Sequence, residues 1–117
     1  MSILNREFKI LDKTLLFIDN LDNLVCNVPR REYYYKDKVI DNSYKLLEYI
    51  IRGNNIDNDD SMRKKCLCEI IVCISLLNSY LNRFYFKKYI SEKQLFKSIN
   101  LLNEIHLMVN SWLSLKN

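Results

Sequence analysis

The chain has 117 residues, of which 49% are hydrophobic and 27% are charged. This composition excludes a disordered chain, and the length suits a single domain over residues 1–117 with one hydrophobic core. One glycine and one proline leave too few turn residues for a β protein, so the sequence predicts an all-α fold. The formal net charge of +4 is compatible with an anionic partner but does not establish one.

The first half of the chain predicts two helices joined by a short loop. Apolar residues at three- and four-residue spacing predict a helix over residues 5–26, which Pro29 and the residue before it end. The same line, which includes Leu11, Leu15 and Ile18, is expected to face the core. A second helix is predicted over residues 32–52, and Gly53 is expected to end it in the left-handed conformation.

The second half predicts two more helices. The third begins between residues 59 and 61 and ends at residue 86 or 87, and residues 67–77 are apolar on nearly every side of it. A helix that is apolar all round is expected to be buried all round. The fourth begins near Ser91, because Ser91 and Gln94 have the spacing of a capping box, in which each side chain bonds to the backbone N–H of the other residue.

Four helices joined by short loops predict an up-down-up-down antiparallel four-helix bundle. A second apolar line on the first helix, and a matching one on the fourth, repeat every seven residues and suggest a second buried surface. A cyclic homo-oligomer would cover that surface. The residues expected in this interface are Ile10, Phe17, Leu24, Leu101, Met108 and Leu115.

Catalysis and metal binding have little support in the sequence. The only histidine, His106, lies near the inward face of its helix, and no glycine-rich phosphate loop is present, so no enzymatic activity, cofactor or metal is expected. The four cysteines, Cys26, Cys66, Cys68 and Cys73, fall in apolar helical patterns and are expected to be buried and reduced, which indicates a cytoplasmic protein. Residues 67–77 are too short a run to predict a membrane span.

The predicted topology places the first and third interhelical loops at the same end of the bundle. Arg30, Arg31, Lys36, Lys87, Lys88 and Lys93 gather there, opposed by Glu32, Asp37 and Glu92. Tyrosines at 33–35, 85 and 89 could stack on bases beside these cations. Arg63, Lys64 and Lys65 form a weaker patch at the other end. The alternative stays open that Lys87 and Lys88 only complement the dipole of the helix they end.

Several segments of the chain resemble one family of four-helix-bundle proteins. They are Val28-Pro29-Arg30, the run from Lys45 to Asn54, the helix start from Ile90 to Gln94, and the run from Leu101 to Ile105 followed by Trp112-Leu113. The family comprises the accessory variability determinant proteins of diversity-generating retroelements and the proteins encoded within intervening sequences of bacterial 23S ribosomal RNA genes.

The resemblance implies a homopentamer with a basic surface and no enzymatic activity of its own. For the accessory branch it implies association with a retroelement reverse transcriptase and its template RNA during mutagenic cDNA synthesis. Two functions therefore stand side by side. One is a nucleic-acid-binding accessory protein with RNA or cDNA as partner, and the other is an intervening-sequence protein that acts as a protein-interaction scaffold. Neither function requires a membrane or a small-molecule substrate.

Overall fold

The computed structural model describes residues 2–55 and 60–114, with the side chains of residues 9–55 and 61–111. These residues form four α-helices and one short 3-10 helix, and no strand occurs among them. The α-helices are α1 (Ser2–Val25), α2 (Tyr33–Asn54), α3 (Asp60–Phe86) and α4 (Glu92–Ser114), and the 3-10 helix is η1 (Arg30–Glu32). The predicted all-helical fold is confirmed, and the observed bounds lie within a few residues of the predicted ones.

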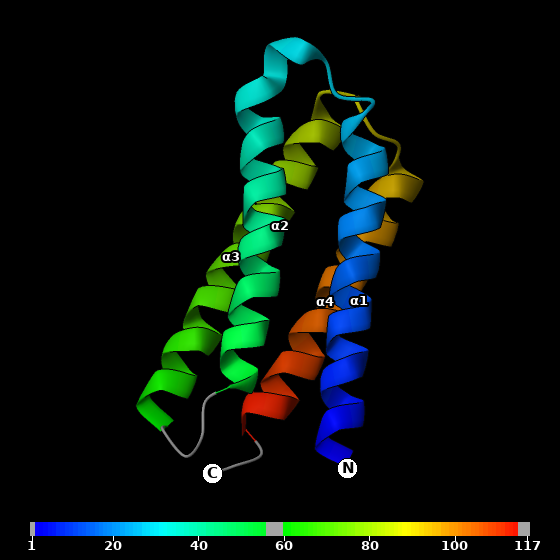
Figure 1. The fold of residues 1–117 in the computed structure, drawn as a ribbon. Helices are drawn as coiled ribbons and strands as arrows, with labels where there is room; N and C mark the ends of the chain where they lie inside the picture. Colours follow the sequence, from blue (N-terminus) through cyan, green and yellow to red (C-terminus); the bar gives the residue numbers. More distant parts are fainter. Residues whose placement is uncertain (1, 56–59, 115–117) are drawn as a thin grey trace.

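The helices form an elongated bundle measuring 45 × 22 × 16 Å. α1 packs against α2 and α4, and α3 packs against the same two helices. In Figure 1 the α1–α2 connection and the α3–α4 connection lie at one end of the bundle, while the start of α1 and the last turns of α4 lie at the other. Segments far apart in the sequence therefore share one end of the molecule.

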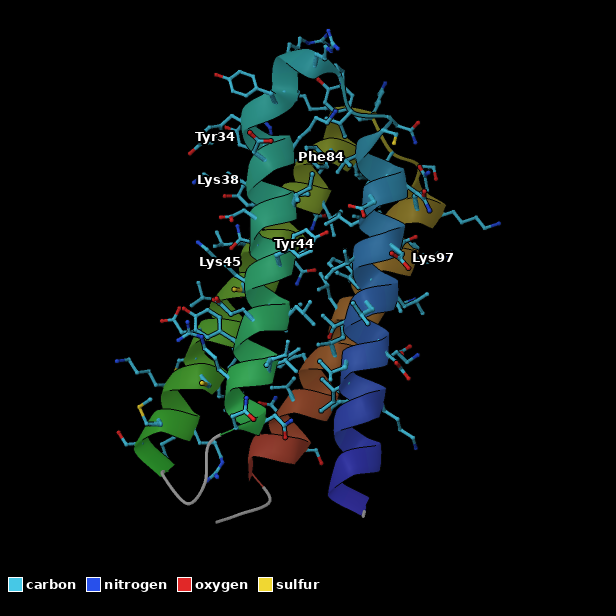
Figure 2. The ribbon with its side chains drawn as sticks, in the orientation of Figure 1. Tyr34, Lys38, Tyr44, Lys45, Phe84 and Lys97 are labelled. Carbon is cyan, nitrogen blue, oxygen red and sulfur yellow. The ribbon has the colours of Figure 1, made fainter. Side chains whose placement is uncertain are left out.

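The core lies along the centre of the bundle and draws on all four helices. Its fully buried side chains include Phe17 and Leu21 of α1, Leu46 of α2, Leu77 and Phe84 of α3, and Leu102 and Ile105 of α4. Burying a side chain of this size contributes about 1.5–3 kcal/mol to stability. Figure 2 shows Phe84 close to the end where α3 and α4 are joined, so the core extends up to the loops of that end.

The structure corrects the two apolar lines predicted on α1 and α4. Ile10, Phe17, Leu24 and Leu101 are buried within the single chain, whereas Leu15 is 48% exposed. Met108 is half-buried, and Leu115 lies outside the described residues. The two lines on α1 share one wide apolar arc, and packing against both α2 and α4 turns the seven-residue line inward. Ile10, Phe17, Leu24 and Leu101 therefore belong to the core of the single chain, which corrects their assignment to an interface, while the assignment of Met108 and Leu115 stays a prediction.

The prediction that α3 is buried on all sides is also wrong. Ile71, Val72 and Leu76 are 37%, 52% and 37% exposed, because the bundle covers only the side of α3 that meets α2 and α4. No charged residue lies between Glu69 and Arg83. Within the described residues, the segment Ser61–Phe86 is long and apolar enough to cross a membrane, although a buried helix of a bundle has the same length and composition.

Gly53 does not end α2 as predicted. It is buried inside the helix, and no described glycine has a positive φ. The helix instead continues to Asn54, and the N–H of Asn55 donates to the carbonyl of Arg52 at 3.1 Å to close the last turn. This hydrogen bond satisfies a helix end without any left-handed residue.

The left-handed residue is found at the end of α3 instead. Lys88 has φ 66°, and it is the one non-glycine residue with positive φ in the part of the chain that the structure describes. The N–H of Lys88 donates to the carbonyl of Tyr85, and the N–H of Tyr89 donates to that of Phe84, both at 2.9 Å. These two bonds make a Schellman motif, in which glycine is the usual residue at the position of Lys88. The left-handed conformation costs a non-glycine residue about 1–2 kcal/mol.

The capping box at the start of α4 is confirmed. The N–H of Ser91 donates to Gln94 Oε1 at 2.8 Å, and the N–H of Gln94 donates to Ser91 Oγ at 3.1 Å. Such caps contribute about 1 kcal/mol and fix where a helix begins. The left-handed Lys88 and the capped Ser91 together give a short, defined turn between α3 and α4.

Candidate nucleic-acid interface

Three segments bring exposed cations together at the end of the bundle where α1 meets α2 and α3 meets α4. We call this surface the basic end, and its cations are Arg30 and Arg31 of η1, Lys87 and Lys88 after α3, and Lys93 in the first turn of α4. Arg31 Nη2 lies 3.5 Å from the hydroxyl of Tyr89, to which it donates, so the two connections are in direct contact. None of these five cations forms an ion pair with a carboxylate of the described residues.

Glu32 was expected to oppose this positive charge, but the structure places it below the surface. Its side chain is buried and accepts hydrogen bonds from Arg83 Nη2, at 3.4 Å to each carboxylate oxygen, and from the Tyr89 hydroxyl at 3.3 Å. The guanidinium of Arg83 also lies 3.9 Å from the centre of the Tyr35 ring. Arg83 therefore neutralises Glu32 below the surface, and Glu32 does not offset the positive charge of the exposed cations.

The remaining acidic residues of the basic end are Asp37 and Glu92, which are both exposed. Glu92 accepts a hydrogen bond from the Tyr85 hydroxyl at 3.5 Å. Lys36 is half-buried and donates to the carbonyl of Val28 at 3.1 Å, so it braces the loop after α1. Positive charge still predominates on this surface, as an anion-binding site requires.

The aromatic residues of the basic end divide into structural and exposed members. Tyr35 and Tyr89 are held by Arg83 and Glu32, whereas Tyr33 and Tyr34 are 69% and 56% exposed. Figure 2 shows Tyr34 one turn from Lys38 on the outer side of α2, with the lysine Nζ 5.6 Å from the ring centre.

The most exposed aromatic side chain of the basic end, Phe86 at 79%, was not singled out from the sequence. The available signal was its place immediately before Lys87 and Lys88, at the end of α3. Phe86 makes a tilted contact with Tyr85, with the ring centres 5.9 Å apart. An apolar ring left in water beside cations is a feature of surfaces that stack nucleic-acid bases.

The predicted second patch is only partly exposed. Lys64 and Lys65 lie on the surface, but Arg63 is 5% exposed and cannot present its charge to a phosphate. Consecutive helical residues point about 100° apart, and Arg63 shares the inward face with Cys66 and Ile70. The prediction for Arg63 is therefore corrected, and two of the three residues remain as candidates.

The titratable groups elsewhere in the chain have structural environments. Burial raises the pKa of the Cys66 and Cys73 thiols, which keeps them protonated and poorly nucleophilic. Cys26 and Cys68 are exposed, contrary to expectation, because Cys26 lies in the turn after α1 and Cys68 lies on the outer face of α3. No cluster of three or more histidine, cysteine or acidic residues suited to a metal occurs among the described residues. The absence of catalysis and of cofactors stays a prediction.

Comparisons of the chain with models of known protein families, with curated proteins and with solved structures give no match.

Proposed function

We propose that this chain is a non-enzymatic nucleic-acid-binding protein of the cytoplasm, and that its basic end contacts the sugar–phosphate backbone. The observation that carries the proposal is the gathering of five exposed cations from three segments, while the nearby Glu32 is buried and neutralised by Arg83. Cations on a protein surface bind nucleic acid by displacing its counterions, whatever its sequence. Arg30, Arg31, Lys87 and Lys88 are the proposed backbone contacts, with Lys64 and Lys65 as a weaker second patch.

The strained backbone of Lys88 supports this proposal over a purely structural role. Complementing the helix dipole does not require Lys88, because Lys87 already supplies a cation at this helix end. Glycine would fit the left-handed position without strain. Residues held in unfavourable conformations cluster at functional sites. A lysine in this place therefore favours a role for its side chain in binding.

We further propose that the nucleic acid is the template RNA or cDNA of a diversity-generating retroelement, and that the protein assists the reverse transcriptase of that element in mutagenic cDNA synthesis. This proposal depends on the resemblance of the second and fourth helices to the accessory variability determinant proteins. The other branch of the family, encoded within 23S ribosomal RNA intervening sequences, gives the alternative of a protein-interaction scaffold.

The outer face of α3 supports self-association in either case. Ile71, Val72 and Leu76 form an exposed apolar surface with no charge among the neighbouring residues 70–82. Exposed apolar surfaces of this kind mark interfaces. We propose that this face, in place of the seven-residue lines, joins copies of the chain into the cyclic homo-oligomer, a homopentamer by resemblance. Repetition of one basic end around a ring would raise avidity about 100-fold or more.

Binding is tested with the double charge reversal Arg30→Glu and Lys88→Glu. Fluorescence anisotropy with labelled single-stranded RNA, repeated over a range of KCl concentrations, gives the affinity and its salt dependence. We expect the variant to bind unrelated RNA sequences about 10-fold or more weakly and to lower the slope of log K against log salt by about 1–2, because each lost phosphate contact removes part of that slope. Full RNA affinity with an unchanged slope would leave the scaffold as the better proposal.

Self-association is tested by placing a charge on the outer face of α3. We expect Val72→Asp to reduce the mass measured by light scattering to that of a monomer while the helical circular dichroism is retained, because an unpaired charge is costly to bury in an interface. The comparison variant Phe17→Asp puts the same charge in the core and should unfold the chain. A monomeric wild type at micromolar concentration, or a Val72→Asp oligomer of unchanged mass, would refute the proposed interface.

A further inference from the structure

A shallow groove of about 570 Å³, wide open to solvent, lies along the C-terminal part of α3 beside the basic end. Its lining residues come from successive turns of this helix, and they combine amide, hydroxyl, cationic and aromatic side chains. They are Asn78, Ser79, Asn82, Arg83, Phe86 and Lys87. The charge-free apolar face of α3 gives way to this groove over its last turns, so the chemistry of the helix surface changes along its length.

Phe86 supplies the flat apolar wall of the groove. The ring is 79% exposed, and it therefore adds little to the hydrophobic core of the chain. Lys87 follows it directly and is exposed without an ion-pair partner among the described carboxylates. An exposed aromatic face beside a free cation matches the two parts of a nucleotide, since the base has a π-face and the phosphate a negative charge.

The floor of the groove is polar. Asn82 Nδ2 donates to the carbonyl of Asn78 at 2.8 Å, which fixes the Asn82 side chain against the helix. Asn78 Oδ1 and Arg83 Nε are buried and have no hydrogen-bond partner within the described part of the chain. Buried polar atoms normally find a partner, and Asn78 is one of the residues that line the groove. An amide can both donate to and accept from the edge of a base.

We propose that this groove holds an unpaired base of a single-stranded nucleic acid. Phe86 stacks on the base, Lys87 contacts the adjoining phosphate, and the amides of Asn78 and Asn82 face the base edge. The inference deepens the proposed function, on which it depends, because it names single strands in preference to duplexes as the ligand. A base in a duplex has both faces covered by its neighbours and cannot enter the groove.

The groove suits a base better than it suits a lipid surface. A membrane-docking site presents an apolar face bordered by cations, whereas here two asparagines, a serine and an arginine line the hollow beside the exposed ring. The bare apolar surface of α3 lies further back, at Ile71, Val72 and Leu76, and it carries no cation.

The test uses the substitution Phe86→Ala and two probes of equal length, a labelled 12-nucleotide oligouridine and a 12-base-pair RNA duplex. We expect Phe86→Ala to weaken binding of the single strand about 5-fold or more, which corresponds to the loss of one stacked base, and to leave the salt slope unchanged. Binding of the duplex should not change. Because the ring is exposed, circular dichroism should show the variant folded as the wild type is.

Two further variants complete the experiment. Tyr44→Ala removes a ring that is 51% exposed in the middle of α2, away from the basic end, and should leave both affinities unchanged (Figure 2). Phe86→Trp keeps a stacking ring and should retain affinity for oligouridine. Its added tryptophan fluorescence should be quenched by oligouridine beyond any quenching seen with the wild type, whose one tryptophan is Trp112.

The outcomes distinguish this inference from the proposed nucleic-acid-binding function on which it depends. If the wild type binds neither probe, the proposed function fails. If it binds oligouridine in a salt-dependent way and Phe86→Ala binds equally well, the function stands and the base-binding groove is refuted. If Phe86→Ala loses affinity for vesicles of anionic phosphatidylglycerol but not for oligouridine, the ring serves a lipid surface and the inference is overturned.

Discussion

The two ends of the bundle both carry clustered basic residues, but they present them differently. At the basic end, Arg30, Arg31 and Lys88 are exposed and form no ion pair with the described carboxylates. At the opposite end, Arg63 is buried, and the exposed Arg52 pairs with Glu48 at 3.6 Å. Clusters of similar charge in the sequence therefore give different electrostatic surfaces in the fold.

The difference follows from where each cluster lies relative to a helix. Arg30 and Arg31 lie in a 3-10 turn and Lys87 and Lys88 lie just after a helix end, and all four are exposed, although Glu32 of the same turn is buried. Arg63, Lys64 and Lys65 occupy consecutive positions inside α3, and at about 100° per residue one of the three meets the bundle. A run of cations inside an amphipathic helix thus loses part of its surface charge, whereas a run in a turn keeps it.

The largest stability effect that bears on this comparison concerns the ion pair beneath the basic end. Replacement of Arg83 by Met removes the hydrogen bonds to Glu32 and the stacking on Tyr35, and leaves a buried carboxylate without its cation. We expect the free energy of unfolding to fall by about 1–2 kcal/mol, less than for a fully buried pair because the Arg83 side chain is 34% exposed. Urea denaturation followed by circular dichroism measures this change.

The same variant tests whether the basic end requires the network under it. Unchanged stability of the Arg83→Met protein would show that Glu32 is solvated. Its negative charge would then offset that of the exposed cations. Arg52→Met is the matched control at the opposite end, where the exposed pair with Glu48 is expected to contribute less than about 0.5 kcal/mol.

A smaller effect, of opposite sign, is expected at Lys88. Lys88→Gly relieves the left-handed strain, offset in part by the greater freedom of glycine in the unfolded chain, so we expect a gain in stability of about 0.5–1 kcal/mol. The same change removes one proposed phosphate contact and should weaken RNA binding. Thermal unfolding and anisotropy on one sample distinguish the two effects, and a stabilised variant with full RNA affinity would remove Lys88 from the proposed phosphate contacts.

Much of the fold could be predicted from the sequence, because it depends on local signals. The apolar periodicity, Pro29 and the capping box of Ser91 and Gln94 each act over a few residues and set where helices begin and end. The end of α2 could not be predicted in the same way. Gly53 had the right identity for a left-handed cap, but the hydrogen bonds of Asn55 continue the helix past it.

The errors came from properties that only packing decides. Leu15 and Phe17 are two residues apart and point to nearly opposite sides of α1, and the positions of α2 and α4 determine that Phe17 is buried and Leu15 is exposed. The candidate site divides in the same way. Arg30, Lys87 and Lys88 could be identified from their loops, whereas the burial of Arg63 and the exposure of Phe86 depend on the rotation of α3 about its axis.

The salt dependence of RNA binding, measured after charge reversal at each end of the bundle, shows which end contacts the nucleic acid. The account predicts that Arg30→Glu with Lys88→Glu lowers the slope of log K against log salt by about 1–2, and that Lys64→Glu with Lys65→Glu, a change of equal charge, lowers it by clearly less. Equal losses from the two ends would show that RNA responds to net charge alone. A greater loss from Lys64 and Lys65 would place the binding surface at the opposite end and contradict the account.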